Sequence, residues 1–107
     1  MGISHRLTRY AAAATLCACA GMAGAQTSAA PPGRLLASNC FQCHGTNGNP
    51  QVAGFDRLAG RSADDLFKKL KELQAETDPN EIMKVHALGY SDDQLRLIAD
   101  FFSRQLR

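Results

Sequence analysis

The hydrophobic and polar positions follow a helical spacing in two segments of the second half of the chain. Ser62 can cap the start of the first segment, with Asp65 three residues later in an imperfect capping box. Apolar residues recur along one face of this segment and lysines occupy the other. The two sets are Leu66, Phe67, Leu70 and Leu73, and Lys68, Lys69 and Lys71. The pattern predicts a helix of about three turns.

The second helical segment closes the chain. Ser91 and Gln94 form an S-x-x-Q capping pattern, and two aspartates between them place negative charge at the positive end of the helix dipole. Between the two helices, Pro79 in the stretch ETDPN cannot continue a helix, so we expect a break there. The predicted buried face of the closing helix consists of Leu95, Ile98, Phe101, Phe102 and Leu106.

The first half of the chain has weaker signals. Residues 34–40 (RLLASNC) are a short helix candidate, in which Leu36 and Cys40 lie four apart and share one face. Residues 45–60 are rich in glycine and should be mostly irregular, and strand signals are nearly absent from the chain. The predicted fold class is therefore all-α, with short helices and long loops, and with too few apolar side chains to close a core unaided.

The first 25 residues have the pattern of a secretory signal peptide. Basic residues come first, a run of small and apolar residues follows, and the sequence AGA ending at Ala25 matches the A-x-A cleavage pattern. The run is too short for a membrane span. We predict export to the periplasm, a flexible segment at residues 26–33 and one domain at residues 34–107. The alternative is a lipoprotein, because LCAC resembles a lipobox that would make Cys19 the lipidated first residue.

Removing this leader changes the charge and the cysteine count. The 107-residue chain has a formal charge of +2, and two arginines of the leader account for it. The remainder carries equal numbers of basic and acidic residues, so no basic patch argues for nucleic acid. Two of the four cysteines also leave, and Cys40 and Cys43 remain as one pair. A domain this small usually needs a disulfide, a metal or a cofactor to stabilise it.

The remaining pair belongs to the motif CFQCHG, in which His44 directly follows Cys43. A structural zinc site needs four ligands, and no second ligand pair follows. A thiol redox site expects the first cysteine at a helix N-terminus, whereas Cys40 ends a predicted helix. A structural disulfide leaves His44 without a role. Covalent haem attachment uses all three residues, with the thiols bonded to the haem and the histidine bound to its iron.

The second axial ligand has two candidates. Beyond the leader, Met83 is the only methionine and His86 is the only other histidine. Met83 lies in the short segment 81–87, between the loops and the closing helix, where the chain can return to the far face of a haem. We favour Met83 as ligand and place His86 at the solvent side or the haem edge. The alternative for Met83 is an ordinary core position.

These residues carry a resemblance to a family. Residues 33–106 resemble the class I cytochromes c, more narrowly the cytochrome c4/c553 group and the cytochrome subunit of flavocytochrome c sulfide dehydrogenase. The matching stretches are CFQCHGTNGNP, RLAGRSADDLFKKLKEL and IMKVHALGYSDDQLRLIADFFSRQ. The resemblance implies a small class I cytochrome c fold wrapped around one covalent haem c. It also implies thioether bonds at Cys40 and Cys43, with His44 as proximal and Met83 as distal iron ligand.

The resemblance further implies that the first and last helices cross, with Gly33 or Ala37 leaving room for Phe101. At one position the chain departs from the family, which usually has a proline whose carbonyl orients the proximal histidine. Here Asp56 stands at that position, so the identity of the carbonyl is left open. Apolar residues of the same loop are expected to form the wall of the haem site or plain core. They are Val52, Phe55 and Leu58.

The implied function is one-electron transfer through an exposed haem edge, not catalysis. The first hypothesis is a periplasmic monohaem cytochrome that is the partner or subunit of a flavoprotein sulfide dehydrogenase. The second is a free c4/c553-type carrier that feeds a terminal oxidase. The third, from another class, is a binding module stapled by zinc or a disulfide. A stable subunit should expose an apolar patch near the haem edge, whereas a free carrier should have a charged rim.

Overall fold

The computed structural model describes residues 29–107, which form a helical domain without strands in that part of the chain. The predicted signal peptide and the lipobox alternative lie outside the described residues. The all-α prediction is confirmed. The α-helices are α1 (Arg34–Ala37), α2 (Phe41–His44), α3 (Ala63–Gln74), α4 (Ile82–Leu88) and α5 (Asp92–Ser103), and two 3₁₀ helices are η1 (Ser38–Cys40) and η2 (Thr46–Gly48).

The N-terminal helical turns follow one another with little interruption. The helix predicted over residues 34–40 continues as α1, η1 and α2 as far as His44. It ends where Gly45 adopts φ 77° and ψ 160°, a conformation that only glycine takes readily. This ending places the histidine of the motif at the last helical position, immediately before the long loop.

The two long helices begin at the predicted caps. The hydroxyl oxygen of Ser62 accepts a hydrogen bond from the Asp65 amide at 3.3 Å. At the start of α5 the capping box is complete, because Ser91 accepts from the Gln94 amide while the Gln94 side chain accepts from the Ser91 amide at 2.9 Å. The predicted break between the helices is also confirmed, since residues 75–81 are not helical.

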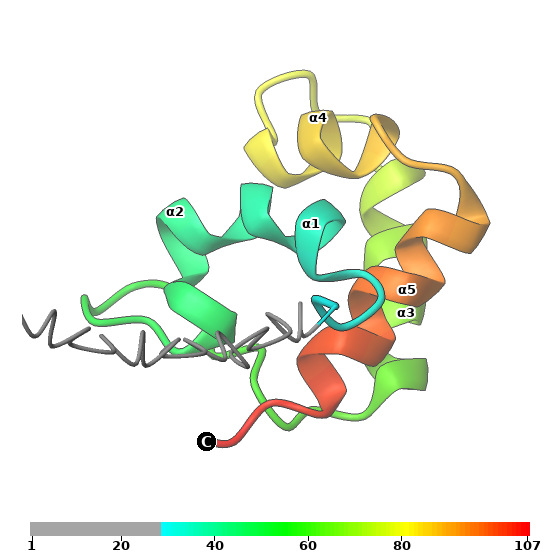
Figure 1. Cartoon of the computed structure of the whole chain (residues 1–107). Coiled ribbons are helices and arrows are strands. Elements are labelled where there is room, and N and C mark those ends of the chain that lie inside the picture. The colour runs from blue at the N-terminus through cyan, green and yellow to red at the C-terminus, as the bar shows by residue number, and fades with distance from the viewer. Residues whose placement is uncertain (1–28) are drawn as a thin grey trace, which may run out of the picture.

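The core lies where α1 and α3 pack against α5. Figure 1 shows α1 crossing α5, and α3 running beside α5. A Cβ atom at Gly33 would lie 2.1 Å from the Leu97 carbonyl oxygen and 3.3 Å from the Phe101 Cβ, so the glycine permits the crossing. Of the two residues expected to leave room at this crossing, Gly33 does so, and it leaves that room mainly for the Leu97 carbonyl and less for Phe101. The buried cluster comprises Ala37, Leu66, Leu95, Ile98, Ala99, Phe101 and Phe102.

Two sequence expectations are wrong. Leu106 is 90% exposed, because α5 ends at Ser103 and the tail turns away from the buried face. The tail instead follows the long loop, where the Asn49 side chain donates to the Leu106 carbonyl at 2.9 Å. Val52 is 62% exposed and belongs neither to the core nor to the cavities described below, because its part of the loop projects into solvent.

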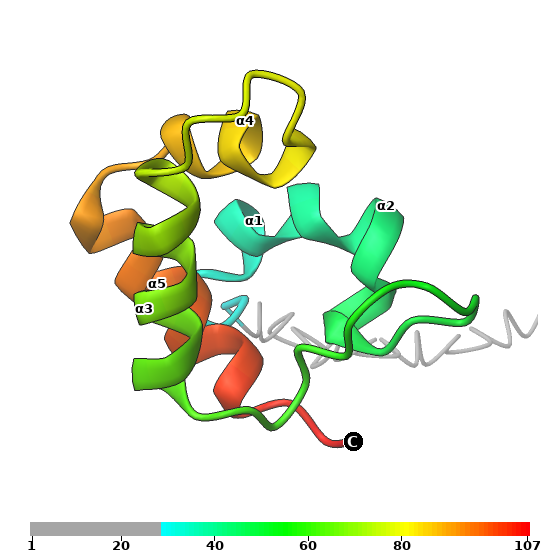
Figure 2. The ribbon, with the colours of Figure 1, turned by 180° about the vertical axis from the view of Figure 1, so that it is seen from behind.

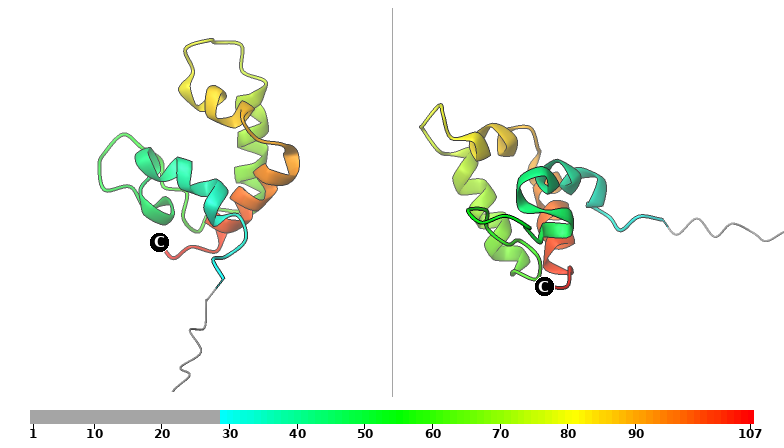
Figure 3. Two further views of the ribbon diagram at one scale, coloured as in Figure 1. Left: turned by 45° about the horizontal axis from the view of Figure 1, so that its top comes forward. Right: turned by 90° about the vertical axis from the view of Figure 1, so that its left-hand side faces the viewer.

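The candidate site described below lies between α3, α4 and the segment formed by α2 and its following loop. In the view from behind, α3 and α5 stand on one side, α2 and the following loop on the other, and α4 lies above (Figure 2). Figure 3 shows the same separation of α4 from the loop at residues 45–60 in two further directions. Within residues 29–107, no helix has the length and apolar character needed to cross a membrane.

Candidate functional site

A crevice separates the CFQCHG motif from helices α3 and α4. Its inner cavity, of about 140 Å³, reaches core residues, and its outer cavity, of about 240 Å³, is lined by surface residues. Both cavities are lined by Cys40, His44, Asp56 and Met83. The inner walls are otherwise mainly apolar, from Leu58, Leu66, Leu70, Leu73, Ile98, Ala99 and Phe102. The crevice is therefore an apolar slot with sulfur and nitrogen atoms at its walls.

A backbone hydrogen bond fixes the orientation of the His44 ring. Its Nδ1 lies 2.7 Å from the carbonyl oxygen of Asp56. Because a carbonyl can only accept, Nδ1 carries a proton and donates it, and Nε2 is the ring nitrogen left to bind a metal. Phe55 packs edge-on against the ring, with centroids 6.2 Å apart. The ring of His44 is thus held in one orientation by the backbone, and the carbonyl left open by the sequence is that of Asp56 itself.

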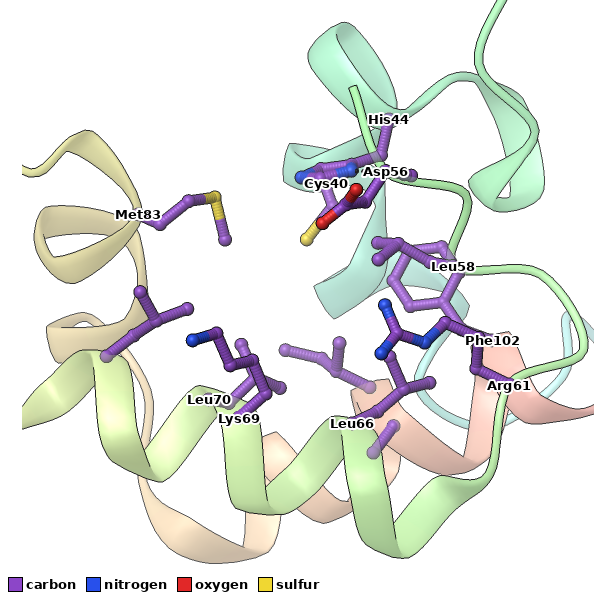
Figure 4. Close-up of a pocket in the computed structure, with 13 residues that line it drawn as sticks. Cys40, His44, Asp56, Leu58, Arg61, Leu66, Lys69, Leu70, Met83 and Phe102 are labelled. Atoms are coloured by element: carbon purple, nitrogen blue, oxygen red, sulfur yellow. Dashed lines mark hydrogen bonds between the residues drawn. The ribbon is translucent and has the colours of Figure 1, made fainter. Parts of the chain in front are cut away.

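Met83 enters the crevice from the opposite side. It lies in the first turn of α4, where its amide donates to the Glu81 side chain at 3.0 Å. Figure 4 shows its side chain extending from α4 toward Cys40 and His44. His86 lines only the outer cavity and is exposed. The structure therefore brings Met83 and His44 to one cavity and places His86 at the surface.

The two cysteines of the motif are not joined in a disulfide, and Cys40 is half-buried while Cys43 is exposed. Burial, followed by the charge of Cys43, raises the pKa of the Cys40 thiol. A thiol redox site needs the opposite shift, because the thiolate is the nucleophile. The alternative of a zinc site finds no support in residues 29–107. No group of three His, Cys, Asp or Glu side chains in this part of the chain is placed to share a metal ion.

Two basic side chains also line the inner cavity. Arg61 follows the loop and Lys69 lies on α3, and both extend into the cavity (Figure 4). Lys69 was expected only on the polar face of its helix, and its ammonium lies 3.7 Å from the Glu72 carboxylate. Nothing in the local sequence marks Arg61 as a site residue. Together the two residues outnumber the Asp56 carboxylate in this cavity and leave it with a positive side that can attract other carboxylates.

Comparison with known proteins adds an independent observation. The family model described as Cytochrome c matches residues 30–104. A cytochrome c-553 from Nitratidesulfovibrio vulgaris is 34% identical over 91 residues, which cover 80% of this chain and 89% of that protein. The cytochrome subunit of sulfide dehydrogenase from Chlorobaculum tepidum is 31% identical over 70 residues, covering 65% and 63% of the two chains.

A third similar protein is longer. The thiosulfate dehydrogenase electron acceptor of Stutzerimonas stutzeri is 37% identical over 67 residues, which cover 60% of this chain and 31% of that protein. This chain therefore spans less than two thirds of the sulfide dehydrogenase subunit and about a third of the electron acceptor.

Proposed function

Because this chain belongs to the cytochrome c family, we propose that it is a periplasmic electron carrier that serves as the partner or subunit of a flavoprotein sulfide dehydrogenase. Membership of this family establishes the fold and the cofactor. The chain is a monohaem c-type cytochrome of the class I fold, its cofactor is covalent haem c, and its relatives carry electrons between redox partners. The predicted resemblance and cofactor are confirmed, and the zinc- or disulfide-stapled module is set aside.

In this proposal, Cys40 and Cys43 would form the thioether bonds, and His44 and Met83 would bind the iron. The fit rests on the chemistry of the crevice. Its apolar walls suit the macrocycle, and Arg61 and Lys69 suit the two haem carboxylates. When bound, the haem takes up and releases one electron at a time. With both His44 and Met83 as ligands, the iron would have no open position for substrate chemistry.

The observation that carries the assignment is the pairing of two features at one cavity. The 2.7 Å hydrogen bond to the Asp56 carbonyl leaves Nε2 of His44 free to bind iron, and Met83 lines the same cavity from the other side. A carbonyl behind a ligating histidine is the usual way that proteins fix its tautomer and raise its basicity.

The test is an optical spectrum of the protein purified from the periplasm of a host that attaches haem c. We expect covalent haem, sharp bands on reduction and the weak long-wavelength band that methionine ligation gives to ferric haem. The mature N-terminus should be Gln26. A colourless protein would contradict the site residues, and a lipidated Cys19 would replace the predicted cleavage by the lipoprotein alternative.

The rim of the crevice supports a docked partner over a free carrier. Ile82 is 64% exposed and Phe55 is 43% exposed, and both line the outer cavity beside the exposed Cys43. Exposed apolar side chains are typical of the part of a surface that becomes the buried centre of a protein interface. The names of two relatives, a sulfide dehydrogenase subunit and a thiosulfate dehydrogenase electron acceptor, point to a dehydrogenase of sulfur compounds as partner.

A substitution at this rim should weaken the complex. In Ile82→Lys, docking would bury an unpaired charge, so we expect affinity for a flavoprotein sulfide dehydrogenase to fall about tenfold or more. The matched control is Leu35→Lys, because Leu35 is 84% exposed and lines neither cavity. Surface plasmon resonance measures both affinities, and the optical spectrum verifies that ligation is intact. Equal affinities for the two variants and the wild type would favour the free carrier to a terminal oxidase.

A further inference from the structure

Helix α4 has little apolar packing of its own. It contains seven residues, and Ala87 is its one buried side chain. Val85 and Leu88, which line neither cavity, are each more than half exposed. Helices of two turns are unstable in isolation, because nucleation costs more than so few backbone hydrogen bonds return. The position of α4, and of Met83 within it, must therefore depend on contacts with other elements.

One of these contacts comes from the end of α3. The side-chain amide of Gln74 donates to the carbonyl oxygens of Ala87 at 2.9 Å and Tyr90 at 3.1 Å. Its own oxygen accepts from the Lys71 ammonium at 2.7 Å, and that ammonium also pairs with Asp92. This arrangement uses both amide protons of Gln74 and orients the group. One half-buried side chain thus connects α3 to the end of α4 and to the turn that follows.

A second contact connects the same turn to the haem-attachment segment. The hydroxyl of Tyr90 donates to the Leu36 carbonyl at 3.1 Å and accepts from the side-chain amide of Asn39 at 2.7 Å. Asn39 directly precedes Cys40. Tyr90 therefore spans from the segment after α4 to the segment that carries the motif, more than fifty positions away along the chain.

We propose that Gln74 and Tyr90 are positioning residues that hold α4 in place and thereby keep the Met83 sulfur in the crevice. This inference rests on the proposed role of Met83 as iron ligand. Removing a residue that orients a metal ligand typically lowers the metal affinity or the activity roughly 10–100-fold. Without the two contacts, α4 moves away more easily, and an external ligand competes better for the position of Met83.

The test is a titration of the ferric, haem-loaded protein with imidazole, in which the intensity of the methionine band reports how much imidazole is bound. In Gln74→Leu we expect imidazole to bind roughly tenfold more tightly and the band to weaken while the far-UV spectrum stays helical. The matched control is Gln105→Leu, because Gln105 also donates a half-buried bond, to Phe101 at 2.7 Å, but contacts neither α4 nor the crevice. Amide hydrogen exchange should accelerate in α4 of the first variant alone.

The outcomes separate the two proposals. If the wild type shows the methionine band and Gln74→Leu binds imidazole like the wild type, the positioning role is wrong and the ligation by Met83 stands. A wild type without the band would overturn both. If Gln74→Leu does not accumulate, Tyr90→Phe, which loses only a hydroxyl, is titrated in the same way, and an unchanged affinity there overturns the inference.

Discussion

Replacing Met83 by alanine should lower the reduction potential by a few tenths of a volt, out of the roughly 0.8 V over which axial ligands tune haem proteins. A thioether favours the reduced iron, so its loss favours the oxidised form. The haem should stay covalently attached, because Cys40, Cys43 and His44 are unchanged. The measurement is a spectroelectrochemical titration of the purified variant, together with the loss of the methionine band in the ferric spectrum.

His86→Ala is the matched control for this prediction. His86 lies on the same helix, three positions further on, and lines only the outer cavity. We expect the variant to keep the methionine band and a potential close to that of the wild type. If His86→Ala loses the low-spin spectrum while Met83→Ala keeps it, the distal ligand is His86. The protein would then have a low potential and a different set of redox partners.

The local features of this fold were accessible from the sequence because they depend on neighbouring residues. Ser62, Ser91 and Gln94 cap their helices through bonds that span three positions, so the pattern of residues suffices to predict them. Leu106 shows the limit of such reasoning. It continues the apolar spacing of α5, but the helix ends three residues before it and the tail binds the loop instead.

The candidate site is predicted from the sequence to the same extent. The CFQCHG motif indicates attachment chemistry from adjacent residues, and the position of Met83 between the loops and the closing helix favours it over His86 as ligand. The groups that support these residues come from distant parts of the chain. The Asp56 carbonyl lies 12 positions from His44, and Gln74 lies 13 from the carbonyl of Ala87. The resemblance to the family pointed to the position of Asp56, but no pattern of side chains indicated the bond from Gln74 to the carbonyl of Ala87.

The crossing of α1 and α5 should be a position where a single methyl group strongly lowers the stability of the domain. Gly33 has a φ of 81°, and a Cβ there would lie 2.1 Å from the backbone oxygen of Leu97. Gly33→Ala therefore adds steric overlap with a helix backbone to the strain of a left-handed conformation. We expect the free energy of unfolding of the ferric protein to fall by about 3–5 kcal/mol, measured by guanidinium titration with the haem attached.

Gly54→Ala separates the two contributions. Gly54 also has a positive φ, of 95°, but a Cβ there meets nothing within 4 Å, so the substitution introduces backbone strain without overlap. It should lower the free energy of unfolding by about 1–2 kcal/mol. If both variants lose the same amount, the left-handed backbone alone accounts for the effect, and α1 and α5 are not in tight contact at Gly33. A larger loss in Gly33→Ala shows that the close approach of the two helices, which holds the haem-attachment segment against the core, requires a residue without a side chain.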